Sequence, residues 1–125
     1  MLDASRARHK VRLAGIDAPE KGQAFGARSK QSLSDCAFGH RAHVEGAKID
    51  RYGRLVGKIV VDGVDCNLRQ IEAGLAWHYK QYQREQSPKD RLVYAEAEET
   101  ARERRAGLWR DQAPEPPWDY RREQR

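Results

Sequence analysis

The chain has 125 residues, of which 38% are hydrophobic and 34% are charged, so it makes one domain whose modest core is built from short apolar runs. No run is long enough to span a membrane and no signal peptide is visible, so we expect no membrane partner and leave the compartment open. The net charge of +5 favours nucleic acid or another anionic partner, although many small basic proteins bind neither.

The first apolar element is a predicted strand within VRLAGIDAPE, residues 11–20. Apolar side chains alternate there with Arg12, and the strand ends in a turn because the residue before Pro19 avoids the helical conformation. The turn carries two carboxylates, Asp17 and Glu20. One carboxylate for a hard metal ion, one for proton transfer and an arginine for a phosphate would suit phosphodiester hydrolysis. On these residues alone, a strand with a solvated acidic turn is the simpler interpretation.

A helix is predicted over residues 24–38, because apolar side chains recur there at helical spacing and Gly39 is a favourable terminator. The next segment, residues 41–48, alternates as a strand, and Gly46 within it indicates a bulge. We expect the helix to pack across the base of the domain with its apolar face in the core.

DRYGR, residues 50–54, is a turn that contributes a second arginine, Arg54, in front of a strongly apolar strand over residues 55–61. Asp62-Gly63 is a strong signal for a two-residue hairpin loop. We therefore expect two antiparallel strands on either side of this loop, the second of them short.

The short return strand, residues 64–66, leads into a second helix for which Asn67 is the predicted N-cap and Gly74 the end. Residues 76–82 are aromatic-rich and predicted to be extended. The return strand, helix and extended segment together complete the central part of the domain.

The last predicted helix covers residues 91–105, with Glu98 among its outward side chains. Its inward positions are Leu92, Ala95 and Ala101. Residues 111–125 are proline-rich and charged, so we predict a mobile or loosely docked tail after a folded domain of residues 1–110.

The two cysteines, Cys36 and Cys66, match no zinc-site spacing and are interpreted as small buried apolar residues, with one disulfide left open. The four histidines form neither a metal site nor a triad, and His78 is interpreted as a surface residue. Trp77 is expected in the core, and Trp109 is expected to dock on the body of the domain.

Four stretches in this order resemble the staphylococcal nuclease (thermonuclease) family: RLAGIDAPE, DRYGR before a strand, NLRQIEAGLA at residues 67–76, and GLW at residues 107–109. The resemblance runs from about Arg8 to Trp109. It implies an α+β protein, an OB-fold five-stranded barrel with about three helices. It also implies a Ca²⁺-dependent nuclease that cleaves the 5′-O–P bond of DNA and RNA with little sequence preference.

The chain departs from the family pattern at its start. Residues 1–10 predict a polar hairpin tip, and the family's first strand and its Asp-Gly-Asp-Thr turn are absent, so we expect an N-terminally incomplete barrel. The second aspartate of that turn is a metal ligand in the family, so calcium binding is expected to be weak or absent. Uncovered strand edges would favour a homodimer through strand exchange or edge pairing.

The resemblance assigns catalytic roles to three residues. Arg12 would clamp the scissile phosphate with two hydrogen bonds, and Arg54 would stabilise charge on the transition state and leaving oxygen. Glu20 would be the general base or would orient the attacking water. Asp17 and the carbonyl of Ala18 would be calcium ligands.

Tyr79, Lys80 and Tyr82 lie where the family contacts the nucleotide base, although edge packing of the two tyrosines is an equally good interpretation. A second hypothesis is a catalytically inactive OB-fold module that only binds nucleic acid or another partner. The absent turn favours that hypothesis. Retention of both arginines and both carboxylates favours the enzyme.

Overall fold

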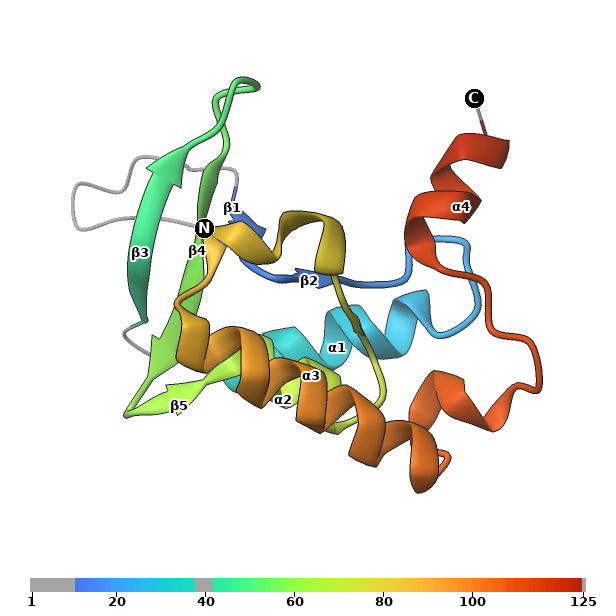
Figure 1. The fold of residues 1–125 in the computed structure, drawn as a ribbon. Helices are drawn as coiled ribbons and strands as arrows, with labels where there is room; N and C mark the ends of the chain where they lie inside the picture. The colour runs from blue at the N-terminus through green and yellow to red at the C-terminus, as the bar shows by residue number, and fades with distance from the viewer. Residues whose placement is uncertain (1–10, 38–41, 125) are drawn as a thin grey trace.

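The computed structural model describes residues 11–37 and 42–124, so the predicted hairpin tip over residues 1–10 and the helix terminator Gly39 lie outside the described residues. Strands and helices are mixed along the chain, which confirms the α+β class (Figure 1). The elements are β1 (Val11–Leu13), β2 (Ile16–Asp17), α1 (Gly26–Ala37), β3 (His43–Ile49), β4 (Leu55–Val61), β5 (Val64–Asp65), α2 (Cys66–Glu72), β6 (Trp77–His78), the 3₁₀ helix η1 (Lys80–Glu85), α3 (Pro88–Glu103), the 3₁₀ helix η2 (Gly107–Arg110) and α4 (Pro117–Glu123).

Strand β4 organises the larger sheet. It pairs in parallel with β1 and antiparallel with both β3 and β5, as its apolar sequence predicts for a central strand. The register of the β3–β4 pair shifts between Glu45 and Lys48, where Gly46 has a φ of 65°, so the predicted bulge is confirmed. The chain leaves this sheet after β1, and strand β2 pairs antiparallel with β6 in a separate two-stranded sheet.

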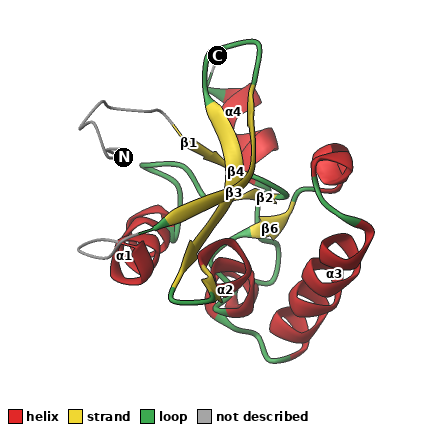
Figure 2. Cartoon of the chain, turned by 90° about the vertical axis from the view of Figure 1, so that its left-hand side faces the viewer, coloured by secondary structure: helices red, strands yellow, loops and turns green. Residues whose placement is uncertain are grey.

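Helix α2 lies at the centre of the helical layer and packs against α1, α3 and β4. Figure 2 shows α1 and α3 on opposite sides of α2. Ile71 of α2 is fully buried and packs with Ile16, Ala76 and Tyr94 in one core cluster. A second cluster contains Trp77 and Trp109, so both tryptophans lie where the sequence predicts.

The N-cap of α2 differs from the prediction. Asp65, not Asn67, caps the helix, because its carboxylate accepts a hydrogen bond of 2.9 Å from the backbone N–H of Leu68. Asn67 is fully buried and uses its side-chain amide to bridge β1 and β4. The return strand therefore ends at Asp65, one residue earlier than expected.

The inward face of α3 also differs. Leu92 is 62% exposed, whereas Tyr94 is 1% exposed and Glu98, predicted outside, is 4% exposed. The buried stripe runs through Tyr94, Glu98 and Ala101 at helical spacing. Glu98 remains buried because its carboxylate accepts hydrogen bonds from the backbone N–H of His78 and from Arg102.

The segment after β6 is not extended as predicted. Only residues 77–78 form a strand, and residues 80–85 form the 3₁₀ helix η1. His78 is 2% exposed, so its interpretation as a surface residue is wrong. Its ring Nε2 lies 3.0 Å from Oε1 of Gln86, which gives the buried imidazole a polar partner.

A disulfide joins Cys36 at the end of α1 to Cys66 at the start of α2, with Cα atoms 6.0 Å apart. The interpretation of both cysteines as free apolar residues is therefore wrong. The pair lies against Ile59 and Val61 of β4, so the disulfide ties the two helices together under the central strand.

Part of the predicted tail is ordered. Residues 117–123 form helix α4, which Figure 1 shows beside the loop after β2. Pro117 is fully buried, and the ring of Trp118 stacks on Tyr79 at 5.2 Å and 7°. The description of residues 111–125 as mobile or loosely docked is thus wrong for α4, while the domain boundary at residue 110 stays a prediction.

None of the helices within the described ranges combines the length and apolar character that crossing a membrane requires.

Candidate active site

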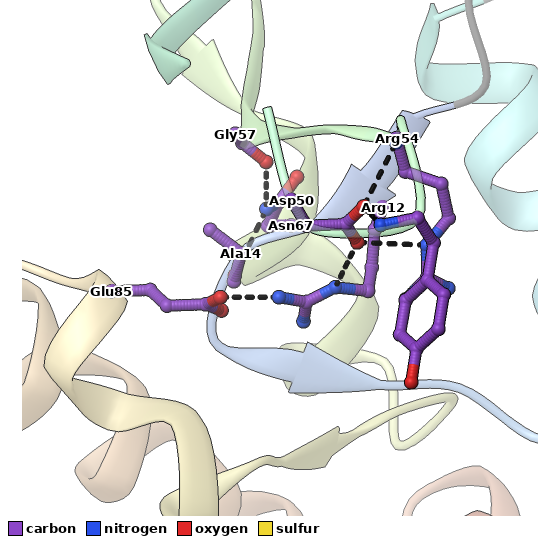
Figure 3. Close-up of polar contacts among 8 residues, drawn as sticks. Arg12, Ala14, Asp50, Arg54, Gly57, Asn67 and Glu85 are labelled. Carbon is purple, nitrogen blue, oxygen red and sulfur yellow. Dashed lines mark hydrogen bonds and ion pairs between the residues drawn. The ribbon is translucent and has the colours of Figure 1, made fainter. Parts of the chain in front are cut away.

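Arg12 enters the candidate site from β1, the parallel neighbour of β4. The amide of Asn67 donates to the carbonyl oxygens of Ala14 (3.1 Å) and Gly57 (3.2 Å), which locks these two strands together (Figure 3). The guanidinium of Arg12 forms an ion pair with Glu85 and lies 5.2 Å from the centre of the Tyr82 ring. Arg12 is therefore fixed at its backbone and held at its charged end.

Arg54 reaches the same place from the turn between β3 and β4. The Oδ1 atom of Asp50 accepts hydrogen bonds of 2.9 Å from the backbone N–H groups of Tyr52 and Arg54, which is how an aspartate closes a tight turn. The Oδ2 atom of Asp50 lies 2.9 Å from Nε of Arg54 and 3.9 Å from Nε of Arg12. One carboxylate thus brings together Arg12 and Arg54, called here the arginine pair (Figure 3).

The bridging carboxylate of Asp50 is favoured in its ionised form. Burial of the group is the largest single effect and acts to raise its pKa, but the hydrogen bonds from the backbone N–H groups of Arg54 and Tyr52 and from the Arg54 side chain together outweigh it. The Arg54 guanidinium adds to their effect, so the pKa of Asp50 lies below its ordinary value.

Asp17 and Glu20, the carboxylate pair, lie on the other side of the candidate site. Asp17 ends β2 opposite Trp77 and is 8% exposed. The turn that follows places Glu20, whose carbonyl accepts a hydrogen bond of 2.9 Å from the N–H of Gln23. A Cβ on Gly26 would lie 2.1 Å from that carbonyl oxygen, so the close approach of α1 to the turn requires glycine.

Arg121 of α4 bridges the carboxylate pair. Its Nη1 donates to Oδ1 of Asp17 (2.8 Å) and to Oε1 of Glu20 (2.6 Å), and its Nη2 donates to Oδ2 of Asp17 (2.7 Å). These are charge-assisted hydrogen bonds in the geometry that arginine favours with carboxylates. The sequence analysis missed Arg121, which it placed in the tail.

Burial and Arg121 act on Asp17 in opposite directions. Burial raises the pKa of Asp17, and the hydrogen bonds and positive charge of Arg121 offset only part of this effect. The pKa of Arg121 rises above its already high ordinary value, chiefly through the hydrogen bonds with Asp17. The guanidinium therefore stays charged and continues to compensate the carboxylates.

The aromatic residues predicted to contact nucleic acid lie between the two pairs. Tyr82 is 41% exposed, packs edge-on against Tyr79 at 4.8 Å and faces the Arg12 guanidinium. Tyr79 is stacked on Trp118, so one of its faces is already occupied. The ammonium of Lys80 lies 3.9 Å from the carboxylate of Glu98.

The described residues bring the four predicted charged residues together as two bridged pairs. No hydrogen bond or ion pair between described residues joins the arginine pair directly to the carboxylate pair, although the Arg12 charge acts on the pKa of Asp17. Tyr52, which the sequence analysis did not single out, is 67% exposed beside Arg54. Its position inside the DRYGR motif, next to Arg54 in space, is the sequence feature that could have identified it.

The carboxylate pair in this arrangement does not fit a divalent cation. Within residues 11–37 and 42–124, no group of three or more His, Cys, Asp or Glu side chains is placed to hold a metal ion. Both oxygens of Asp17 and one of Glu20 accept hydrogen bonds from Arg121, and calcium commonly needs six to eight oxygen ligands.

Comparisons with known proteins agree with the motifs. The sequence model of the family described as staphylococcal nuclease homologue matches residues 10–111. A micrococcal nuclease of Shigella flexneri is 39% identical over 122 residues, which cover 90% of this chain and 68% of that protein. An uncharacterized endonuclease of Haemophilus influenzae is 39% identical over 116 residues, covering 93% of this chain and 62% of that protein.

A plant relative gives a similar match. A probable staphylococcal-like nuclease, CAN1, of Oryza sativa subsp. japonica is 38% identical over 118 residues, which cover 94% of this chain and 34% of that protein. The chain therefore spans only part of each of these relatives. Helix α4 and its Arg121 lie beyond the segment that the family model matches.

Proposed function

This chain belongs to the staphylococcal nuclease homologue family, whose domain is an OB-fold, and we propose that it hydrolyses the phosphodiester bonds of DNA and RNA with little sequence preference. The observation that carries the proposal is the bridged arginine pair, which collects two guanidinium groups around one carboxylate. Two guanidinium groups beside a carboxylate pair suit phosphoryl transfer, because the guanidinium groups can stabilise the negative charge on the oxygen atoms of the transition state.

The arginine pair would bind the substrate phosphate. Asp50 holds Arg54 through its Nε atom, and Glu85 holds Arg12 through its Nη2 atom, so each guanidinium is oriented before substrate arrives. A phosphodiester would take over donors that now pair with these acidic groups. Arg12 would clamp the phosphate, and Arg54 would stabilise the transition state and the leaving oxygen.

Glu20 is the proposed general base, or the group that orients the attacking water. Its side chain is 39% exposed, so water reaches it, whereas Asp17 is largely buried. Only Oε1 of Glu20 is paired with Arg121 among the described contacts, which leaves the other oxygen for a water molecule.

Calcium is the proposed cation, with Asp17 and the Ala18 carbonyl as its ligands. This part of the proposal rests on the family resemblance, and it requires a state in which the Arg121 guanidinium no longer occupies Asp17. Tyr79, Lys80 and Tyr82 are proposed to contact nucleic acid, Tyr82 through the exposed part of its ring.

A homodimer is the proposed assembly, formed through strand exchange or edge pairing. In the described sheet, β1 and β3 are the outer strands of the order β1-β4-β3, so each has one side without a neighbouring strand of that sheet. Size-exclusion chromatography with light scattering over a range of concentrations tests this assembly. A monomer at every concentration contradicts it.

A module that only binds nucleic acid is the second candidate. Arg121 favours it, because this side chain occupies the carboxylates that hydrolysis would use. Binding would then depend on the arginine pair and the exposed tyrosines, while the Asp17–Arg121 contact would be purely structural.

Digestion of DNA and RNA separates the two candidates. Wild type, E20Q and E96Q are compared with added CaCl₂ and with EGTA; Glu96 is an exposed glutamate of α3 and serves as the matched control. We expect calcium-dependent cleavage by wild type and E96Q, and a rate at least about 100-fold lower in E20Q, since general bases typically contribute 10²–10⁴. Nucleic-acid binding without cleavage in all three proteins would favour the binding module.

A further inference from the structure

Arg121 makes the contacts with the carboxylate pair that a bound cation would make. One guanidinium bridges Asp17 and Glu20 and takes both oxygens of Asp17, at 2.8 Å and 2.7 Å. A calcium ion bound by the same oxygens would lie about 2.3–2.6 Å from them, in the space that the guanidinium fills. The two cations therefore exclude each other at these oxygens.

The helix that carries Arg121 is anchored in the folded body. Pro117, at its start, is fully buried, and Trp118 packs with the cluster that contains Trp77 while stacking on Tyr79. Just before the helix, the side-chain amide of Gln23 donates to the carbonyl of Glu115 at 2.7 Å. These contacts hold α4 against the body of the domain and thereby position Arg121 beside the carboxylate pair.

The neighbouring arginine provides an internal comparison. Arg122 is 69% exposed at its side chain and pairs with Asp119 three residues earlier on the same helix. Arg121 is 39% exposed and reaches residues 101 and 104 positions earlier in the chain. Of these two neighbouring arginines, Arg121 directs its positive charge into the candidate site and Arg122 does not.

We propose that Arg121 is an internal cation that holds Asp17 and Glu20 while no divalent metal ion is bound, and that it competes with such an ion for the two carboxylates. A divalent ion gains both carboxylates only when Arg121 withdraws. This inference rests on the proposed function, since it concerns the same carboxylates, but its claim is about cation affinity and not about cleavage. Arg121 acts through the carboxylates and is a positioning residue.

Calorimetric titration of the full chain with CaCl₂ at pH 7 tests the inference, using wild type, R121Q and R122Q. We expect R121Q to bind calcium about tenfold or more tightly than wild type, because charge-assisted hydrogen bonds of this kind exceed the free energy of a tenfold change in affinity. R122Q removes the same charge from the same helix and should retain the wild-type affinity. A lysine at position 121 keeps the charge without the fork, so R121K should fall between wild type and R121Q.

The double variant D17N/R121Q identifies the site and should lose the gain in affinity. The inference is overturned when R121Q binds calcium no more tightly than wild type, including the case in which neither binds. Thermal unfolding checks that each variant folds. If R121Q does not fold, the calcium affinity of R121K is compared with that of wild type instead. Failure of the proposed nuclease activity would instead appear in the digestion of DNA and RNA. The calcium affinities from the titration can be interpreted whether or not the protein cleaves nucleic acid.

Discussion

The arginine pair and the carboxylate pair are held by the same device built in two different ways. In each, one residue of opposite charge bridges two like charges: Asp50 bridges Arg12 and Arg54, and Arg121 bridges Asp17 and Glu20. Asp50 lies four residues from Arg54 in one turn, whereas Arg121 lies 104 residues from Asp17. The first bridge is local on its Arg54 side and reaches Arg12 through the pairing of β1 with β4, whereas the second exists only because a distant helix docks.

The two bridges also differ in their electrostatic balance. At Asp50, backbone N–H groups and the Arg54 side chain together overcome burial and lower the pKa, whereas burial dominates at Asp17 and raises its pKa despite Arg121. A turn supplies its own hydrogen-bond donors to the bridging carboxylate, while a buried strand end depends on a charge brought from elsewhere. The carboxylate pair is therefore the part of the candidate site that is more easily altered.

Removing a member of the arginine pair should give the largest effect. R54A is expected to lower the initial cleavage rate by about 10²–10³, the usual cost of losing a group that stabilises transition-state charge. R54K should recover little, because an ammonium does not reproduce the planar fork. R51A is the matched control, since Arg51 is an exposed neighbour in the same turn. Equal losses in R51A and R54A would mean that the turn supplies only general positive charge.

The strand pairing beneath Arg12 should be the next most sensitive feature. N67A leaves the carbonyl groups of Ala14 and Gly57 and the N–H of Ile59 without their side-chain partner. We expect the free energy of unfolding to fall by about 3 kcal/mol, at roughly 1 kcal/mol for each lost buried hydrogen bond. Urea unfolding measures it, with Q31A on the exposed face of α1 as control. A loss under about 1 kcal/mol would show that β1 does not depend on this bridge.

Local sequence patterns were enough for elements whose stabilising contacts are close in the chain. The apolar run over residues 55–61 matches β4, and the bulge at Gly46 lies where glycine permits a positive φ. The motifs around Arg12 and Arg54 also led to residues that one carboxylate brings together. For β4 and the bulge, the pattern lies in the residues that form the feature, whereas Arg12 and Arg54 lie far apart in the chain and were connected by the family resemblance.

Buried polar residues could not be placed in this way. Asn67, His78 and Glu98 look like ordinary cap or surface residues until distant partners satisfy them inside the fold. The disulfide required the distance between two Cα atoms, which the spacing of cysteines does not give. Arg121 lies in a charged, proline-rich segment, where no local signal separates a docked side chain from a solvated one.

Loosening helix α4 should affect the carboxylate pair and leave the arginine pair unchanged. W118A removes the stack on Tyr79 and the contact with the tryptophan cluster, and we expect a loss of about 2 kcal/mol, less than for a fully buried tryptophan. Hydrogen exchange should speed up in α4 and in residues 17–23, and stay unchanged in the turn at residues 50–54. R122Q is the control on the same helix. Equal acceleration in that turn would contradict the independence of the two pairs.

The smallest effect is a difference in pH dependence between the two aspartates. The pKa of Asp50 is lowered in the folded state, so its stabilising contribution is present above the unfolded pKa of about 3.9 and is lost as the pH falls through the folded value. The free-energy difference between wild type and D50N should therefore be largest near neutral pH and should shrink on acidification.

Asp17 should show the opposite slope. Because its folded pKa is raised, the folded state binds more protons than the unfolded chain, and stability from this group is lost as the pH rises from about 3.9 through the folded value. Wild type should thus gain stability relative to D50N as the pH rises toward about 3.9, and should lose stability relative to D17N as the pH rises above about 3.9. Urea unfolding of the three proteins across pH 3–7 measures both slopes. Parallel slopes would mean that docking of α4 compensates Asp17 as fully as the turn compensates Asp50, which would remove the electrostatic difference between the two pairs.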